Sequence, residues 1–305
     1  MAQQKRGLEE AETLLGGVKA LLLDIEGTVT PISFVKDTLF KYVLDNLESY
    51  VMKHYDDTEL QKDIAALREL SKKDKEANTE GVVEIPNGDG SKDEIVKGVC
   101  ENVKWQMKQD RKSTELKQLQ GHIFKEAYKN GGVSAELFED VAPVLRQLFD
   151  EGLQLYVFSS GSVEAQKLFF AHTSDGDLTD VFSGYYDTTV GGKTESSSYK
   201  TITTEIGNEP DEILFLTDTP EEASAAVEAG IRSTLVIRPG NEDLTDEHLQ
   251  NFSCIERFDE LFGDEDDEED LKRFHGEGDG ECDDDDDDEP EEEEEEQDEE
   301  NAEDA

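Results

Sequence analysis

The hydrophobic positions of the chain gather into four short runs, each followed by small or polar residues. The runs end near Ile25, at Ser159, at Asp218 and around Leu235, with the sequences KALLLDI, LQLYVFS, EILFLTD and STLVIRPG. Each run is too short for a free-standing helix, and each is continuously apolar rather than alternating, as is typical of strands that are covered on both faces. The pattern therefore predicts a parallel sheet.

Segments with helical periodicity lie beside the later runs. AELFEDVAPVLRQLFDEG precedes the second run, SVEAQKLFFAH follows it, and PEEASAAVEAG follows the third. The last segment has Pro220 at a first-turn position and Gly230 at a C-terminal cap position, which are the preferred places for these residues at helix ends. Strand, turn and helix thus repeat, and the repeat predicts a doubly wound, Rossmann-like α/β domain.

More than a hundred residues separate the first run from the second, far more than one crossover connection needs. Residues 35–130 have the pattern of several amphipathic helices, among them VKDTLFKYVLDNLESYVMKHY and IVKGVCENVKWQMKQDRK, interrupted by the polar loop NTEGVVEIPNGDGSKDE. We expect an inserted helical cap at 35–130 above the carboxyl ends of the strands, and an α/β core formed by 1–34 and 131–263.

The last part of the chain differs from the rest in its strongly acidic composition. Residues 264–305 hold 28 acidic and two basic residues, and so carry 26 of the 49 net negative charges. A segment this polar cannot bury enough apolar surface to offset its chain entropy, so we expect a disordered acidic tail that raises solubility or contacts basic proteins. The other 263 residues carry 50 acidic against 27 basic side chains, which argues against a nucleic-acid partner.

Several other classes of protein find no support in the sequence. No apolar run approaches the roughly 20 residues that span a bilayer, and MAQQKRGLEEAETLL lacks the apolar centre of a secretory signal. Three scattered cysteines and five dispersed histidines favour neither a disulfide framework nor a zinc site. We expect a soluble cytoplasmic protein with no membrane partner, and leave the nucleus open as a second compartment.

Polar side chains stand where the predicted strands end. Asp24 and Glu26 follow the first run, Ser159 and Ser160 follow the second, and Asp218 follows the third. Ligands of an open parallel sheet bind at the carboxyl ends of its strands. Asp and Ser also cap helices at such turns, so any one of these residues has an ordinary structural explanation. All of them together predict a ligand site.

The residue types indicate which ligand this site would take. Carboxylates at Asp24 and Asp218 are costly to bury without a cation, and oxygen ligands with no His or Cys nearby favour Mg²⁺ over Zn²⁺. Ser159 opens a turn into a helix, whose free N–H groups attract anions. Lys193, in the glycine-flanked stretch TVGGKTESSSY, offers a mobile positive charge, and Lys200 competes with it for this role. The combination predicts a phosphoryl ligand beside a nucleophilic aspartate.

The order of these residues resembles the four motifs of the haloacid dehalogenase superfamily of phosphatases: Asp24-x-Glu26-Gly-Thr, then Ser159, a lysine and Asp218. Five stretches over about residues 18–262 further resemble the enolase-phosphatases of methionine salvage, namely LLLDIEGTVTPISFV, KWQMKQDRKSTELKQLQGHIF, SSGSVEAQKLFF, LFLTDTPEEASAA and VIRPGN. Glu26 stands where most of the superfamily has a second aspartate, which departs from the general pattern but matches the enolase-phosphatase form.

The resemblance implies a haloacid dehalogenase core with its cap, and one active site that performs two steps. These are enolisation of 2,3-diketo-5-methylthiopentyl 1-phosphate and then loss of phosphate, which gives the acireductone 1,2-dihydroxy-3-keto-5-methylthiopentene. Asp24 would attack phosphorus and form an aspartyl phosphate, and Glu26 would protonate the leaving oxygen and later activate water. The resemblance also implies one Mg²⁺ per subunit, bound by Asp24, Glu26 and Asp218.

Ser159, Ser160 and Lys193 are implied as the substrate-binding residues. We prefer Lys193 to Lys200 because it matches the lysine of the family and lies in a flexible turn, whereas Lys200 falls in a predicted helix. The family also implies a monomer and a small phosphorylated molecule as the partner.

Two alternatives stay open. The first is an ordinary phosphatase of the same superfamily that acts on another small phosphate ester; absorbance from an enol or acireductone product would distinguish the two enzymes. The second is an acidic interaction protein that binds basic partners through its tail and uses the α/β domain as a scaffold. The joint presence of Asp24, Glu26 and Asp218 argues against a scaffold without activity.

Overall fold

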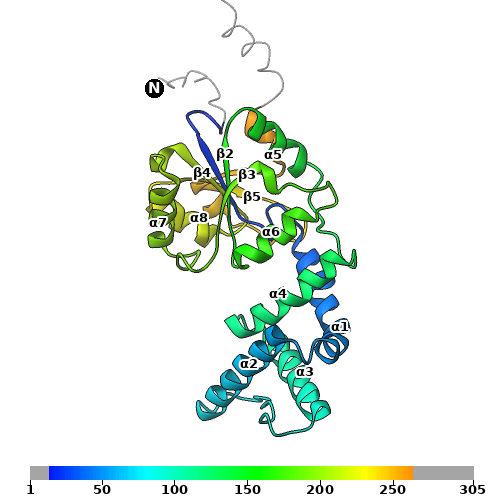
Figure 1. Cartoon of the computed structure of the whole chain (residues 1–305). Coiled ribbons are helices and arrows are strands. Elements are labelled where there is room, and N and C mark those ends of the chain that lie inside the picture. The colour runs from blue at the N-terminus through cyan, green and yellow to red at the C-terminus, as the bar shows by residue number, and fades with distance from the viewer. Residues whose placement is uncertain (1–13, 264–305) are drawn as a thin grey trace, which may run out of the picture. The chain divides into compact units, whose positions relative to one another are not determined.

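The computed structural model describes residues 14–263, so the predicted acidic tail at 264–305 lies outside the described residues (Figure 1). Six strands form one parallel sheet in the order β3-β2-β1-β4-β5-β6. Their bounds are β1 Ala20–Leu23, β2 Gln154–Phe158, β3 Phe182–Tyr186, β4 Ile213–Thr217, β5 Arg232–Val236 and β6 Ser253–Ile255.

Helices connect the strands and cover the sheet. The α-helices are α1 Phe40–Lys53, α2 Thr58–Glu76, α3 Lys92–Lys108, α4 Thr114–Lys129, α5 Val141–Asp150, α6 Val163–Ala171, α7 Ser196–Ile206, α8 Pro220–Glu228 and α9 Asp246–Asn251. A π-helical stretch, Phe34–Leu39, leads into α1, and short 3₁₀ turns lie at Thr179–Val181, Pro210–Glu212 and Phe258–Phe262.

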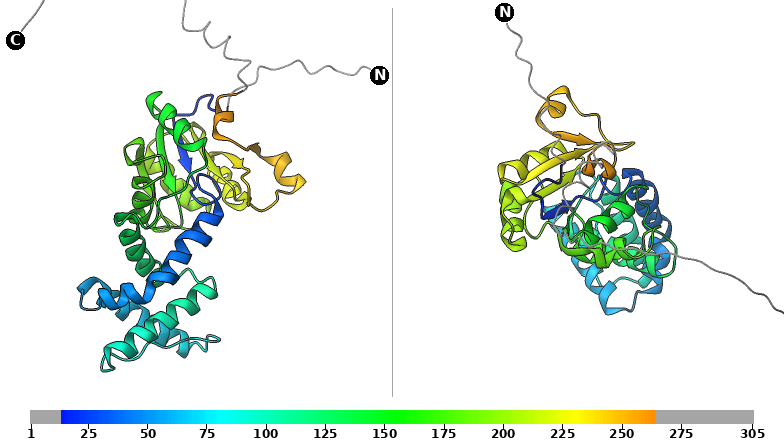
Figure 2. Two further views of the ribbon diagram at one scale, coloured as in Figure 1. Left: turned by 90° about the vertical axis from the view of Figure 1, so that its right-hand side faces the viewer. Right: turned by 90° about the horizontal axis from the view of Figure 1, so that it is seen from above.

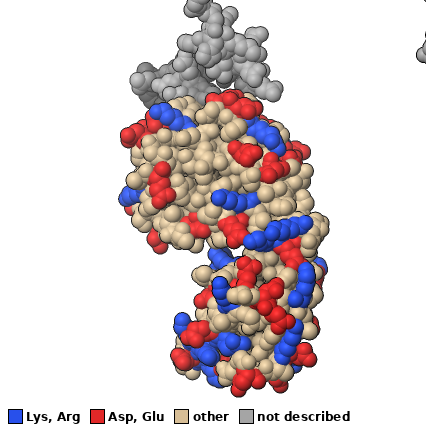
Figure 3. Space-filling view, in the orientation of Figure 1, with Lys and Arg blue, Asp and Glu red and all other residues tan. Residues whose placement is uncertain are grey.

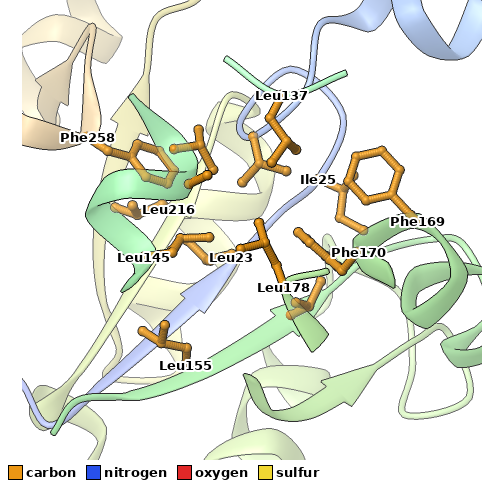
Figure 4. Packing of buried hydrophobic residues seen from close by; sticks show 14 of the residues in the cluster. Leu23, Ile25, Leu137, Leu145, Leu155, Phe169, Phe170, Leu178, Leu216 and Phe258 are labelled. Carbon is orange, nitrogen blue, oxygen red and sulfur yellow. The ribbon is translucent and has the colours of Figure 1, made fainter. Parts of the chain in front are cut away.

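Alternate residues of the central strand face two different hydrophobic clusters. Leu21 and Leu23 pack with residues of α5 and α6, and Figure 4 shows Leu23 among the side chains of this cluster. Ala20 and Leu22 pack with residues of α7 and α8 on the other side. Figure 1 shows these two pairs of helices on opposite faces of the sheet. The continuous apolar run of β1 is thus explained by burial on both faces, and the predicted doubly wound α/β fold is confirmed.

Two strands and the start of one helix differ from the sequence-based prediction. β3 and β6 were not among the predicted strands, and the helix predicted over 135–152 begins only at Val141, after Asp140. The two residues predicted at the ends of α8 lie there in the structure. Pro220 is the first residue of the helix, and Gly230 follows the C-cap with φ of +91°.

Helices α1–α4, called the cap from here on, have a hydrophobic cluster of their own. Val43, Leu47 and Val51 line one face of α1 at four-residue spacing, and they pack with apolar residues from α2, α3 and α4. α4 also packs against α6 of the core, and Figures 1 and 2 show the cap helices gathered around one another. The boundaries of the inserted domain at 35 and 130 stay a prediction.

The described surface carries both signs of charge. On the face seen in Figure 3, basic side chains lie among acidic ones over both the core and the cap. Over residues 14–263, no helix has the length and apolar character required to cross a membrane.

Candidate active site

Asp24 follows the last residue of β1 and is held rigidly at the carboxyl end of the sheet. Its backbone N–H donates to the carbonyl of Leu216 in β4 at 2.9 Å, so the strand pairing fixes where it lies. Its Oδ1 accepts a hydrogen bond of 2.7 Å from the Ile25 N–H. The residue is only 5% exposed. A carboxylate this buried requires compensating positive charge.

Lys193 supplies that charge. Its Nζ lies 2.6 Å from Asp24 Oδ1 and 2.6 Å from Glu222 Oε2, and its side chain is 9% exposed. The loop that carries it is tied down by the Tyr199 hydroxyl, which donates to the Lys193 carbonyl at 2.7 Å. Although burial disfavours an ammonium group, the two carboxylates raise the pKa of Lys193. Lys200, the competing candidate, is exposed within α7.

Glu222 is a member of the site that the sequence interpretation missed. It lies in the first turn of α8, and its Oε2 accepts from the Thr217 hydroxyl at 3.0 Å. Burial and the neighbouring Asp24 carboxylate raise the pKa of Glu222 to about 7. The only signal was its position four residues after Asp218 in the quoted stretch LFLTDTPEEASAA, where an acid also suits the first turn of a helix.

The two oxygens of Asp24 differ in their surroundings. Oδ1 contacts both the Lys193 ammonium and the Ile25 N–H, whereas the hydrogen bond found at Oδ2 is a long one of 3.4 Å from the Thr217 hydroxyl. Oδ2 is therefore the less encumbered oxygen and the one better placed to act as a nucleophile.

The turn after Asp24 brings the neighbouring loops close together. Gly27 has φ of +79°, and a Cβ atom there would overlap Oδ2 of Asp218. Asn241, from the stretch VIRPGN, donates through Nδ2 to the Gly27 carbonyl at 2.9 Å. Because Gly27 has no side chain, Asp218 can approach the loop after β1. A larger residue at position 27 would prevent this approach.

Asp218 and Glu26 are the other acidic groups of the site. Burial and the Asp24 carboxylate raise the pKa of Asp218 to about 6, and its Oδ1 accepts from the Thr219 hydroxyl at 3.1 Å. Glu26 is the more exposed of the two, and burial of its carboxyl group by surrounding protein atoms, followed by the Asp24 carboxylate, raises its pKa. Both shifts arise first from burial and then from the nearby Asp24 carboxylate, and a cation bound between the carboxylates would oppose them.

The donor set fits a magnesium ion. Mg²⁺ typically takes one or two carboxylates, with substrate and water oxygens completing its coordination, and the carboxylates of Asp24 and Asp218 meet that requirement. No group of three or more His, Cys, Asp or Glu side chains positioned to hold a metal occurs within residues 14–263. A site with two carboxylates and a backbone carbonyl, such as that of Glu26, is consistent with this finding.

Ser159 and Ser160 lie at the end of β2, the strand next to β1. The Ser159 hydroxyl accepts from the Gly161 N–H at 3.3 Å, and Ser160 is exposed. Two amides of the α6 N-terminus already have partners: Val163 N–H donates to Asp187 at 3.0 Å, and Ala165 N–H donates to Ser162 at 3.3 Å. An anion would therefore be bound by the loop before the helix rather than by the full helix N-terminus.

The arrangement combines a buried carboxylate at Asp24, the Lys193 ammonium beside it, an exposed carboxyl group with a raised pKa at Glu26 and the serine-containing loop after β2. These are the components that a phosphoryl transfer requires, since the reaction depends on positioning and on neutralising the charge of the equatorial oxygens.

Comparisons with known proteins identify the family of the chain. Residues 18–230 match the family model of the haloacid dehalogenase-like hydrolases. The chain is 46% identical over 246 residues to an enolase-phosphatase E1 of Xenopus tropicalis, covering 80% of this chain and 94% of the relative. It is 47% identical over 241 residues to that of Acyrthosiphon pisum, covering 79% and 96%. Among solved structures, the UTR4 protein of Saccharomyces cerevisiae aligns with a TM-score of 0.62 and 30% identity, covering 79% of this chain and 98% of that one.

Proposed function

Because the chain belongs to the haloacid dehalogenase-like hydrolases and, within them, to the enolase-phosphatase E1 family, we propose that the Asp24 site converts 2,3-diketo-5-methylthiopentyl 1-phosphate to an acireductone and phosphate. The observation that carries the phosphatase half is the contact between Asp24 and Lys193 at 2.6 Å in a buried setting. The enolase half rests on the family.

Phosphate loss proceeds in two displacements. Asp24 Oδ2 attacks phosphorus, the bond from phosphorus to the ester oxygen breaks, and the Glu26 carboxyl group gives its proton to the leaving oxygen. Glu26, now a carboxylate, then takes a proton from water, which attacks the aspartyl phosphate and frees inorganic phosphate. Glu26 follows Asp24 by two residues and is exposed, so its carboxyl group can exchange this proton with the leaving oxygen and with water.

The other residues of the site position the reacting groups. The Lys193 ammonium offsets the charge of Asp24 and lies where an equatorial phosphate oxygen would approach. Ser159 and Ser160 would bind the phosphoryl group from the loop after β2. When bound, one Mg²⁺ held by the carboxylates of Asp24 and Asp218 and the carbonyl of Glu26 would act as a Lewis acid toward the phosphate and the diketone.

Turnover of the diketo phosphate with two simultaneous readouts tests the proposal. We expect the ultraviolet absorbance of the enol or acireductone and the release of free phosphate, both dependent on Mg²⁺. Release of phosphate from other small esters but no enol from the diketo phosphate would favour the ordinary phosphatase. Absence of phosphate release from any ester would favour the interaction protein.

A further inference from the structure

The side chain of Asn241, in the loop after β5, has one buried oxygen whose role the mechanism above does not explain. Within residues 14–263, no donor lies at hydrogen-bond distance from its Oδ1, although this atom is shielded from solvent. Burying an acceptor without a donor costs free energy, so such atoms are rare in folded proteins. When one occurs beside a functional site, a ligand of that site is the natural source of the donor.

The orientation of the Asn241 amide is fixed by its other end. Nδ2 donates to the Gly27 carbonyl at 2.9 Å and to the Val236 carbonyl at 3.3 Å. Only the NH₂ group of an amide can serve two carbonyl oxygens, because the amide oxygen is an acceptor. Oδ1 is therefore the end of the side chain that remains available to another group.

This available oxygen lies next to a carboxylate of the metal site. A Cβ atom at Gly27 would lie 2.3 Å from Asp218 Oδ2 and 3.2 Å from Asn241 Oδ1. The two oxygens thus border the same small space beside Gly27. Asp218 is one of the two carboxylates to which we assign the magnesium ion, so the unpaired amide oxygen is close to that ligand.

The groups around Oδ1 do not supply its donor. An ionised Asp218 carboxylate accepts hydrogen bonds only, as Oδ1 does, so neither oxygen can satisfy the other. The Thr28 hydroxyl of the β1 loop is buried as well, but it makes no hydrogen bond within the described part of the chain. The Lys193 ammonium is engaged by two other carboxylates. A water bound to Mg²⁺ would be a suitable donor, because this ion usually keeps several of its waters and polarises them.

We propose that Asn241 is a positioning residue of the magnesium site, whose Oδ1 accepts a hydrogen bond from a water bound to the ion while its Nδ2 holds the β1 loop. The inference rests on the proposed function, since the ion is the cofactor of that function. Groups that bind the ligands of a metal, rather than the metal itself, orient those ligands and increase the affinity for the ion. One side chain would thus connect the loop that carries Asp24 with the ion beside Asp218.

Titration of each metal-free protein with Mg²⁺ alone, followed by isothermal titration calorimetry, tests this role. Asn241→Leu removes both ends of the amide and should weaken Mg²⁺ binding by about 10- to 100-fold. Asn241→Asp loses the donor to Gly27 but keeps an acceptor, so it should bind Mg²⁺ within about threefold of the parent or more tightly.

Thr30→Val is the matched control for damage to the same loop. The Thr30 hydroxyl donates to the Glu136 carbonyl at 2.5 Å, and valine removes this bond with little change of shape. The control should have a lower melting temperature in metal-free buffer, yet its affinity for Mg²⁺ should stay within about threefold of the parent, because no group of the metal site is removed.

Several results would overturn the inference. They are an unchanged affinity in Asn241→Leu, an equal loss in Asn241→Leu and Thr30→Val, and a loss of about tenfold or more in Asn241→Asp, which would assign the effect to the donor at Nδ2. The Asp variant decides the question alone if the Leu variant does not fold. Absence of Mg²⁺ binding by the parent would overturn the inference together with the metal assignment. A parent that binds Mg²⁺ but makes no enol from the diketo phosphate would contradict the proposed function alone.

Discussion

The Lys193 ammonium lies between the carboxylates of Asp24 and Glu222, and the protonation of Glu222 depends on both of these neighbours. Burial and then the Asp24 carboxylate raise the pKa of Glu222 to about 7, and the single Lys193 ammonium, which contacts both carboxylates, only partly offsets this increase. In the unfolded chain this carboxyl group would titrate near its ordinary value of 4.5. The folded state thus binds the proton more tightly, so ionising Glu222 destabilises the protein as the pH rises from about 4.5 to 7.

Glu222→Gln should remove this effect. Between about pH 5 and pH 8 the free energy of unfolding of the variant should fall less than that of the parent, by a few kcal/mol, because the amide does not ionise. Denaturant unfolding at several pH values measures the difference. Glu221→Gln, at the exposed neighbouring position, is the control and should follow the parent. If the Glu222→Gln variant loses stability with pH as steeply as the parent, Glu222 does not titrate in this range.

The residues of the site could be predicted only where their type and their position beside an apolar run or a glycine were unusual. Asp24 and Asp218 end apolar runs, and Lys193 sits between glycines and polar residues, so their types and positions were visible in the sequence. Glu222 and Asn241 were not, because an acid in the first turn of a helix and an Asn in a loop are ordinary there. Their roles come from contacts with Lys193 and Gly27, which only the folded chain brings together.

The elements around the β1 loop are joined through one buried arginine. Arg238, just after β5, forms two hydrogen bonds with Asp140 at the start of α5, at 2.9 and 2.7 Å. It also donates to the carbonyls of Thr28, at 3.2 Å, and Glu256, at 2.8 Å. Its guanidinium and the N–H of Phe258 hold the pKa of Asp140 below its usual range despite burial. The β1 loop, the start of α5 and the residue after β6 are thus all bound by this one side chain.

Arg238→Met should therefore be strongly destabilising. Removing one partner of a buried ion pair leaves the other charge uncompensated and costs about 3–5 kcal/mol. Arg257→Met is the control, because its partners Glu139 and Asp259 are exposed, and it should change stability far less. Urea unfolding of the two variants measures the difference in stability. Similar midpoints for both would contradict a large stabilising contribution from the buried pair.

At the level of elements, the sequence predicted the central strands and missed the edges. The four apolar runs became β1, β2, β4 and β5, which lie inside the sheet and are largely buried. β3 and β6 are the two edge strands; β3 contains Gly184 and an exposed Ser183, and β6 has only three residues. An edge strand is covered on fewer sides, so its sequence does not need the apolar run that identified the others.

At the scale of the whole molecule, we expect magnesium binding to depend on pH. Burial and Asp24 raise the pKa of Asp218 to about 6, so below that pH a proton occupies the carboxylate that a cation needs. Saturating Mg²⁺ should stabilise the protein, by about 2.7 kcal/mol at 100 times the dissociation constant. We expect the increase in melting temperature to be larger near pH 8 than near pH 5.5, and to disappear in Asp218→Asn. An equal increase in that variant would assign the effect to other acidic groups.

The central claim is that Asp24 carries the phosphoryl group during turnover, and rapid quenching of the working enzyme tests it most directly. During steady-state turnover of the diketo phosphate with Mg²⁺, acid quenching followed by peptide mass analysis should find a phosphoryl group on the peptide that contains Asp24. Asp24→Asn should show neither this modification nor release of phosphate, because an amide is a poor nucleophile. A phosphoryl group on another residue, or release of phosphate by the Asp24→Asn variant at about a tenth or more of the parental rate, would contradict the account.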